Sequence, residues 1–236
     1  MAKKRLKIAL VLRSGGDFTV DHVKTLVAQL PTGYDVLCFT DMPFVMDRVT
    51  CIPLSRSYRG MRGWWAKIDL FRPDVTDDLL YMDLDTVIVG GLSAILKTTG
   101  QTMVMLSDFY HPQNLMSSVM YIPNNVKAKI WSAFWKDPMR HVAECTVTSK
   151  WGDQGFIRGV IGDCRRWQDI LPGQFVSYKA DIAKLGENPW ATERYSKGDG
   201  TLPAGTRVVV FHGQPRPHDT AEPWIPEFQY FDRPSS

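Results

Sequence analysis

The sequence predicts an α/β fold with a mixed, mostly parallel sheet, helices on both faces of the sheet, and a C-terminal tail rich in proline and aromatic residues. Two observations support this: short apolar runs alternate with segments of helical periodicity, and the composition is that of a globular chain. Hydrophobic residues make up 44% and charged residues 22% of the 236 residues, which excludes a disordered polymer. No linker interrupts the chain, so we expect a single domain over 1–236.

The first part of the chain follows a strand, helix, strand pattern. Residues 7–13 (KIALVLR) form a continuous apolar strand, and apolar residues then recur at helical spacing over 20–30 until Pro31. Residues 34–40 (YDVLCFT) and 49–54 (VTCIPL) are expected to be the next two strands. Strands that are joined through a helix predict parallel pairing and burial on both faces.

The remainder of the chain continues this alternation up to its tail. Pro-rich residues 213–236 cannot form a central strand or a long helix, so we expect them to wrap over the domain as a tail or lid. Before this tail, helices are expected over 64–71, from Asn124 or Asn125 up to Pro138, and from about 151 to 161, with strands from Leu79 and at 103–106, 119–122 and 207–211.

Charge and cysteine usage narrow the class of protein. The formal net charge of +3 is too small to indicate a nucleic-acid protein by itself, although it leaves an anionic partner open. The cysteines, Cys38, Cys51, Cys145 and Cys164, lack zinc-binding spacing and are expected to be free thiols in a reducing compartment. The apolar run near the N-terminus is too short to span a bilayer, so we expect a cytoplasmic protein without a transmembrane segment.

Two aspartates interrupt the apolar run 79–91 (LLYMDLDTVIVGG). In a strand, Asp83 and Asp85 would point to one side and Leu84 to the other. Neighbouring carboxylates repel, and burying them unpaired is unfavourable, whereas a hard cation such as Mn²⁺ or Mg²⁺ binds them and completes its coordination with water and phosphate oxygens. Aspartates that cap a turn would give the same pattern, but the apolar flanks argue against an exposed turn. The sequence therefore predicts a metal site at the carboxyl end of a strand.

A second apolar strand, 207–211, is followed by His212 and a glycine. Imidazole is an acceptable ligand for Mn²⁺, so His212 could complete a site of two carboxylates and one nitrogen. On the residues alone, a structural histidine that caps the strand end is the commoner explanation.

With these motifs the sequence resembles the nucleotide-sugar-dependent glycosyltransferases of the Rossmann-like GT-A fold, in particular the family 8, glycogenin-like branch. In that family a strand ending in D-x-D binds Mn²⁺ and the diphosphate of a UDP-sugar. The resemblance implies that Asp83, Asp85 and His212 are the metal ligands, that Asp83 also contacts the donor, and that Arg216 reaches the diphosphate from "HGQPRP". The family's usual spacing, H-x-x-G-x-x-K-P-W, is not kept here.

The resemblance also assigns roles near the donor sugar. Asp153 and Gln154 in "WGDQGF" would face its anomeric carbon, although an acid in the first turn of a helix has a structural role too. Ser107 and Asp108, which follow the strand at 103–106, would contact the sugar, and an ordinary turn explains them nearly as well. Ser117 is the expected polar contact in "LMSSVMYIPN".

The nucleotide would lie against the ends of the first two strands. Arg13 and Ser14 close the first strand and Thr40 closes the second, at the rim where a GT-A protein holds base and ribose. Lys67 is expected to contact the diphosphate. The other basic residues before the metal strand, Arg56, Arg59 and Arg62, form a solvated loop or contact the acceptor. One or two of the tryptophans could stack on sugars. The candidates are Trp64, Trp65, Trp151, Trp190 and Trp224.

The resemblance implies transfer of a sugar from a nucleoside-diphosphate sugar, with uridine and retention favoured, to a hydroxyl acceptor. The acceptor could be a saccharide, a protein side chain or a hydroxylated DNA base. Two alternatives stay open. A nucleotidyltransferase acting on a sugar phosphate would usually carry a glycine-rich loop with a lysine, of which "RSGGDF" is a weak version. A non-catalytic module would bind sugars or nucleic acid through the basic loop and the tryptophans.

Overall fold

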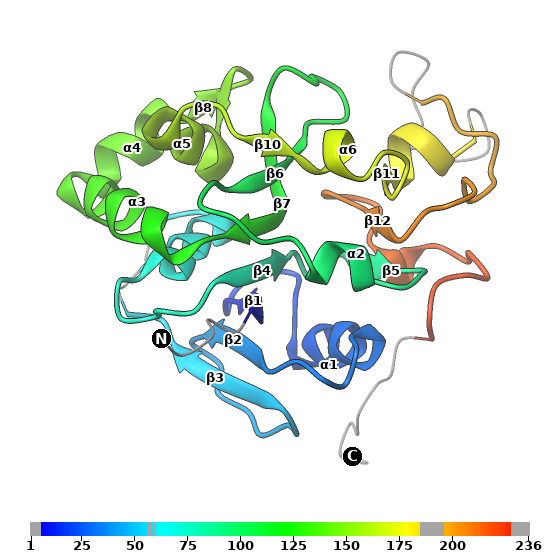
Figure 1. Ribbon diagram of the computed structural model, residues 1–236, viewed down its shortest axis with the longest axis horizontal. Helices are drawn as coiled ribbons and strands as arrows, with labels where there is room; N and C mark the ends of the chain where they lie inside the picture. The colour runs from blue at the N-terminus through cyan, green and yellow to red at the C-terminus, as the bar shows by residue number, and fades with distance from the viewer. Residues whose placement is uncertain (1–5, 56–57, 59, 185–195, 228–236) are drawn as a thin grey trace.

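The computed structural model describes residues 6–55, 58, 60–184 and 196–227, and its centre is a mixed, seven-stranded sheet (Figure 1). Three of its four parallel pairs join β1, β2, β3 and β4, and the fourth joins β6 to β10, while β7 runs antiparallel to β4 and β6. The mixed, mostly parallel sheet predicted from the sequence is thus confirmed. Its strands, in spatial order, are β10 (Arg165–Arg166), β6 (Val104–Ser107), β7 (Leu115–Ile122), β4 (Leu79–Met82), β1 (Lys7–Leu12), β2 (Val36–Thr40) and β3 (Val49–Pro53).

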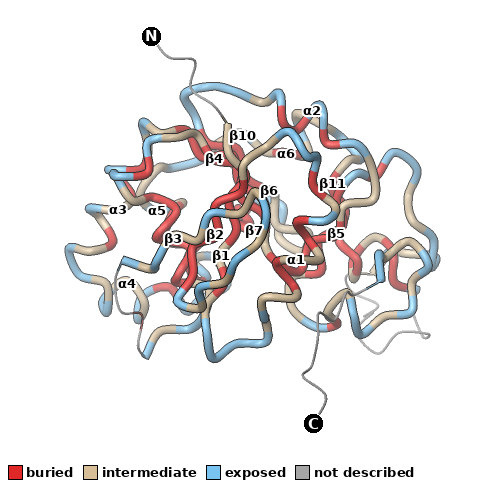
Figure 2. The backbone as a smooth tube through the Cα atoms, turned by 90° about the horizontal axis from the view of Figure 1, so that it is seen from below, coloured by how far each residue is buried: buried red, intermediate tan, exposed pale blue. Residues whose placement is uncertain are grey.

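Helices cover both faces of this sheet, as expected for strands that are apolar throughout. Ile8 and Leu10 of β1 point into the core formed with one set of helices, and Ala9 points into the core on the other face. Figure 2 shows the strands as a buried centre within more exposed loops. The first face carries α1 (Val20–Gln29), α2 (Ser93–Leu96) and α6 (Trp167–Ile170); the second carries η1 (Gly63–Phe71), α3 (Asn124–Lys136) and α5 (Gly152–Ile161).

A second, three-stranded sheet lies beside the first and changes the interpretation of the run 79–91. In it β12 (Val208–Val210) pairs in parallel with β11 (Phe175–Ser177) and antiparallel with β5 (Thr86–Ile88). The run is therefore not one strand: β4 belongs to the large sheet and β5 to the small one, and Asp83, Leu84 and Asp85 form the turn between them. Both the N–H and the hydroxyl of Thr86 donate to the Asp83 carbonyl and close this turn, at 3.1 and 2.7 Å.

Other elements differ from the expectation in detail. The segment 64–71 lies within the 3₁₀ helix η1, and β7 is longer than predicted. Pro138 ends α3 as expected, and it also begins α4 (Pro138–Glu144), because proline is well tolerated in a first helical turn. The remaining short elements are the hairpin β8 (Thr146–Val147) and β9 (Lys150–Trp151), η2 (Tyr178–Ile182) and η3 (Pro217–Asp219).

The C-terminal segment wraps over the small sheet as far as the structure describes it. Trp224 packs near the rings of Tyr178 and Phe211, with centroids 6.3 and 6.4 Å away. Residues 228–236 of the expected tail lie outside the described residues. The cysteines are free, as predicted, with Cys38 and Cys145 buried. In the part of the chain that is described, every helix is too short or too polar to cross a membrane.

A buried carboxylate holds η1 in place. Asp69, with 0% exposure, accepts hydrogen bonds from the Ser55 N–H at 2.6 Å, from the Ser55 hydroxyl and from the Tyr58 hydroxyl. The Arg72 guanidinium lies 4.0 Å away, which is further compensation for the buried charge. Since Lys67 precedes Asp69 by less than one turn, this network also fixes where Lys67 points.

We predict that Asp69→Ala lowers the free energy of unfolding by about 3 kcal/mol, because the donors of Ser55 and Tyr58 lose a buried acceptor. Urea denaturation measures the change. Asp74→Ala is the matched control: Asp74 also pairs with Arg72, at 2.6 Å, but its side chain is 61% exposed, so the expected loss is below about 1 kcal/mol. Equal effects of the two substitutions would contradict the assigned role of Asp69.

Candidate active site

A cavity of about 800 Å³ opens at the carboxyl ends of β1 and β4, beside the first residues of β7 and α5. Thr40 and Ser107 are not among the residues that line it: the Thr40 hydroxyl caps the Met42 N–H, and the Ser107 backbone pairs with the Gln168 amide. The other predicted site residues line the cavity together: Arg13, Ser14, Lys67, Asp83, Asp85, Asp108, Ser117, Asp153, Gln154, His212 and Arg216.

The turn between the two sheets brings both of its aspartates to this cavity, each against a cation. Asp83 accepts from the Lys67 ammonium at 2.8 Å and from the Tyr81 hydroxyl at 2.5 Å. Asp85, 4% exposed, accepts from the Arg216 guanidinium at 2.5 Å and from the Gly213 N–H at 3.3 Å. A single turn between two sheets therefore carries two carboxylates whose counter-charges come from elements distant in sequence.

The cations do not fully compensate the negative charge of this turn. Burial, followed by the charge of Asp83, raises the pKa of Asp85 above its ordinary value, although Arg216 and the Gly213 N–H oppose the shift. Burial alone would lower the pKa of Lys67, but the carboxylates of Asp153 and Asp83 outweigh burial and raise it. Lys67 is therefore held as a cation. A further positive charge next to Asp85 would stabilise its ionised carboxylate.

The third predicted metal ligand is engaged elsewhere. The His212 Nε2 lies 2.7 Å from the Ser177 hydroxyl, and its ring stacks on Phe109 with centroids 5.8 Å apart. Burial, followed by the charge of Lys179, lowers the pKa of His212 to about 3, so the ring is neutral at pH 7. Its backbone has a φ of 36°, which is uncommon for a residue with a side chain.

The predicted set of three metal ligands is consequently not assembled: within the described residues, no three histidine, cysteine or acidic side chains gather closely enough to hold an ion. Asp83 and Asp85 by themselves still fit a hard cation, because Mg²⁺ and Mn²⁺ are commonly held by one or two carboxylates together with water and substrate phosphates. The raised pKa of Asp85 is consistent with such a role.

The start of α5 places Asp153 and Gln154 on the opposite wall. Asp153 is 4% exposed, and its Oδ2 has no hydrogen-bond donor among the described residues, while the Lys67 ammonium lies 3.9 Å away. Burial raises the pKa of Asp153, although Lys67 opposes the shift. Gln154 Oε1 accepts from the Ser117 N–H at 3.3 Å. Asp153 does not cap the helix, since Trp151 occupies the N-cap position, and its buried Oδ2 keeps an unused acceptor at the wall of the cavity.

Arg216 makes further contacts in this region, which also contains three residues that sequence reasoning missed: Tyr81, Asp17 and Phe18. The Arg216 guanidinium pairs with Asp17 at 2.9 Å and lies 4.5 Å from the Phe18 ring centroid. Arg216 thereby joins the loop after β1 to the C-terminal segment. Tyr81, the strand residue two before Asp83, could have been found from strand alternation, whereas nothing in the sequence pairs Asp17 or Phe18 with Arg216.

The predicted residues at the outer rim are all engaged in hydrogen bonds with other protein groups. Arg13 donates to the carbonyls of Tyr58 and Met61 and so holds the loop before η1. The Ser14 hydroxyl donates to Asp41 at 2.6 Å. Asp108 accepts from two backbone N–H groups of its own turn.

Two tryptophans and Arg62 line a further part of the cavity. Trp64 and Trp151 both line it, with ring centroids 6.2 Å apart, and the Arg62 guanidinium lies over Trp64. Trp65 and Trp224 instead pack in hydrophobic clusters. Arg56, Arg59 and Trp190 lie outside the described residues.

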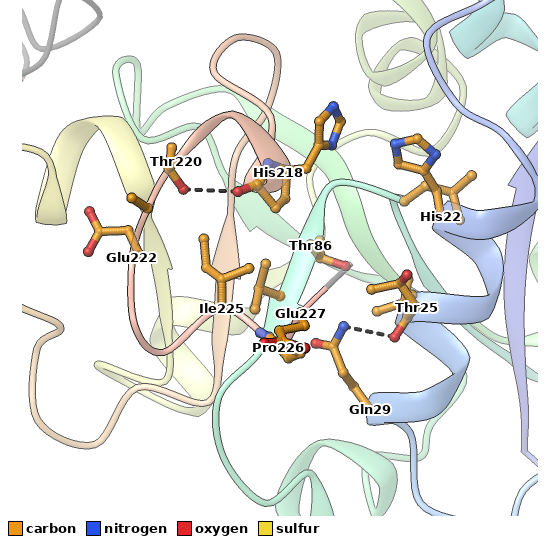
Figure 3. A pocket seen from close by; sticks show the side chains of 15 residues that line it. His22, Thr25, Gln29, Thr86, His218, Thr220, Glu222, Ile225, Pro226 and Glu227 are labelled. Atoms are coloured by element: carbon orange, nitrogen blue, oxygen red, sulfur yellow. Dashed lines mark hydrogen bonds between the residues drawn. The ribbon is translucent and has the colours of Figure 1, made fainter. Parts of the chain in front are cut away.

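A second cavity, of about 500 Å³, lies behind the same turn (Figure 3). Leu84, which stands between the two aspartates, lines both cavities. Residues of α1, including His22 and Gln29, face Ile225 and Pro226 of the C-terminal segment across this space (Figure 3). The turn 83–85 is therefore hollowed on both sides.

Comparisons with known proteins show which solved structures have a similar fold. No protein-family model matches the sequence, and no curated protein matches it. Among solved structures, glycosyltransferase GlyE of Streptococcus pneumoniae TIGR4 superposes with a TM-score of 0.61 at 13% identity, over 90% of this chain and 56% of that one. The chain thus spans little more than half the length of GlyE. An active-site mutant of LgtC gives a TM-score of 0.59 at 12% identity, over 92% and 91% of the two chains.

A further structure, galactosyltransferase LgtC in complex with donor and acceptor sugar analogues, gives a TM-score of 0.57 at 10% identity and covers 89% of this chain and 88% of that one. The chain has the GT-A fold of these glycosyltransferases, and the resemblance to the family 8 branch is confirmed at the level of the fold. At 10 to 13% sequence identity, similarity to these structures establishes the fold of this chain and does not establish its reaction.

The raised pKa of Asp85 predicts the effect of Asp85→Asn on stability. Between the ordinary aspartate pKa and the raised one, the unfolded chain ionises first, so the wild type loses stability as pH rises through this interval. Asparagine does not ionise. We therefore expect Asp85→Asn to be more stable than wild type at pH 7, with a difference that shrinks as pH falls towards the ordinary aspartate pKa of about 4.

Urea denaturation across this pH range, without added divalent ions, tests the prediction. Asp17→Asn is the control, because it also removes a partner of Arg216 but from a side chain that is 62% exposed, and its effect should stay within about 0.5 kcal/mol at every pH. A loss of stability in Asp85→Asn at pH 7 would show that the Arg216 pair outweighs burial.

Proposed function

We propose that this chain is a glycosyltransferase that moves a sugar from a nucleoside-diphosphate sugar to a hydroxyl acceptor. The observation that carries the proposal is the meeting of Asp83, Asp85, Asp153, Lys67 and Arg216 in one cavity at the carboxyl edge of the sheet. This is where open α/β sheets bind their ligands, and the fold is that of known glycosyltransferases.

The diphosphate is assigned to the Asp83–Asp85 side of the cavity. The two carboxylates would hold Mn²⁺ or Mg²⁺, which when bound supplies positive charge for the leaving diphosphate. Lys67 and Arg216 add fixed cations at the same place, 2.8 and 2.5 Å from the carboxylates that they now neutralise. His212 stays a candidate ligand that would have to exchange its contact with Ser177.

The donor sugar is assigned to the α5 side. The Asp153 carboxylate oxygen that lacks a donor can accept a sugar hydroxyl, and the side chain amide of Gln154 lies next to it. Ser117, whose hydroxyl accepts from Lys67 at 3.1 Å, and Asp108 would contact the same sugar. The family resemblance favours a uridine base and retention of the anomeric configuration. A cytoplasmic location would fit a soluble acceptor.

The acceptor is assigned to the part of the cavity beside Trp64 and Trp151. Aromatic rings provide stacking surface for a saccharide, and Arg62 could reach an anionic group on a larger acceptor. A saccharide is therefore preferred to a protein hydroxyl or a hydroxylated DNA base.

A nucleotidyltransferase fits the site less well. That reaction would place a triphosphate against the loop after β1, yet the acid of this loop, Asp17, points to Arg216 and the segment 13–19 contains no lysine. A non-catalytic module leaves the buried carboxylates unexplained, because stacking on tryptophans does not need them.

Nucleotide release from a panel of UDP-, GDP-, dTDP- and CMP-sugars tests the proposal. We expect release from one donor class with Mn²⁺, and at least about a hundredfold less with EDTA or in Asp85→Asn, since both remove charge stabilisation of the leaving group. Asp74→Asn changes an exposed acid beyond the end of η1 that does not line the cavity, so this variant should behave as wild type.

Two results would overturn the proposal. Turnover of a sugar phosphate with a nucleoside triphosphate, in place of any nucleotide-sugar, would favour the nucleotidyltransferase. Sugar binding that is unchanged by EDTA and by Asp85→Asn, with no donor turned over, would favour the binding module.

A further inference from the structure

Lys179 is a basic residue beside the cavity that the sequence did not single out. It lies two residues after β11, and His212 lies two residues after β12. Because these strands are parallel, with Ser177 in register with Val210, both residues come to the same edge of the small sheet. The Lys179 ammonium donates to the His212 carbonyl at 3.1 Å.

The Lys179 ammonium differs from the other two cations in its charge pairing. Lys67 is neutralised by Asp83, and Arg216 by Asp85 and Asp17. For Lys179 the described residues provide no ion pair: its ammonium donates to a neutral carbonyl, and burial lowers its pKa although the charge of Asp85 opposes the shift. A partly buried cation without a contacting counter-ion is unfavourable, so an anionic ligand would relieve this cost.

Lys179 is not among the residues that line the cavity, but its ammonium lies next to Gly213, which is. Gly213 lines the cavity and has a φ of +105°, and a Cβ built on it would lie 3.7 Å from the Lys179 Nζ. The Gly213 N–H also donates to the Asp85 carboxylate, so Gly213 lies close to both the ammonium and this carboxylate.

We propose that Lys179 forms an anion site with Arg216 and binds the diphosphate of the donor from the side opposite Lys67. This assignment rests on the proposed function, which supplies the diphosphate. The diphosphate would then be held between basic residues of three segments: η1, η2 and the C-terminal segment. Lys179 would act by binding the leaving group and would take no part in proton transfer.

Binding of inorganic pyrophosphate in the presence of Mn²⁺, measured by titration calorimetry, tests the site without depending on the identity of base, sugar or acceptor. Lys179→Gln keeps a donor for the His212 carbonyl but removes the charge. We expect it to weaken pyrophosphate binding at least about tenfold and to lessen the dependence of binding on salt. Lys179→Arg should bind within about threefold of wild type, since it restores the charge.

Two controls separate charge from folding. Lys129→Met removes a lysine from the exposed face of α3 and should leave binding unchanged. The midpoint of thermal unfolding of Lys179→Gln should be equal to or above that of wild type, because burial disfavours the charged ammonium more than the charge of Asp85 favours it.

The possible failures are distinguishable. Pyrophosphate binding by Lys179→Gln that equals wild type would overturn the role of Lys179 and leave the proposed function standing. If the wild-type protein bound no pyrophosphate with Mn²⁺ and released no nucleotide from any donor, the proposed function would fail, and the role of Lys179 with it.

Discussion

The candidate site depends on how two carboxylates in one short turn, Asp85 buried and Asp83 partly buried, are neutralised. Asp83 and Asp85 stand on either side of Leu84 where the chain leaves the large sheet for the small one. Each carboxylate pairs with a cation, Lys67 of η1 or Arg216 of the C-terminal segment, although these cations do not fully compensate the negative charge. Each of these cations would be poorly solvated without its carboxylate, so the two ion pairs help to fix the positions of two elements that are distant in sequence.

Several features away from the turn serve this arrangement. The Asp69 network fixes η1 and thereby the direction of Lys67. The Phe211 and Trp224 packing holds the C-terminal segment over the small sheet, which positions Arg216. The stacking of His212 on Phe109 and the absence of a side chain at Gly213 leave space beside Asp85. The arrangement has a cost in stability, because Asp85 and Asp153 are buried with raised pKa values that a ligand or cation would relieve.

Most of the fold could be predicted from the sequence, because apolar runs and helical periodicity report directly which faces are buried. These patterns predicted the first three strands, β1, β2 and β3, and the helices α1, α3 and α5. The break between β4 and β5 could not be predicted, since the continuous apolar run 79–91 gives no sign that its two halves join different sheets. The aspartates were placed on a strand for that reason, although their position at the sheet edge was predicted correctly.

For the site, the sequence revealed polar residues at strand ends but not the contacts between distant segments. Residues that follow apolar strands, such as Asp83 and His212, were found because a strand end is visible in sequence. Thr40 and Ser107 also follow this rule, yet their polar groups are used by neighbouring backbone and Gln168. The pairing of Arg216 with Asp17, and the place of Lys179 beside Gly213, depend on contacts between distant segments that periodicity cannot report.

The central claim is that the turn 83–85 binds a divalent cation together with a diphosphate. Anomalous diffraction from crystals grown with Mn²⁺ and a nucleoside diphosphate tests it most directly. The account predicts one strong manganese peak within coordination distance of both the Asp83 and Asp85 carboxylates, with phosphate oxygens on its other side and Arg216 moved from Asp85 towards the diphosphate. Diphosphate bound without manganese at these carboxylates, or manganese bound elsewhere in the cavity, would contradict the account.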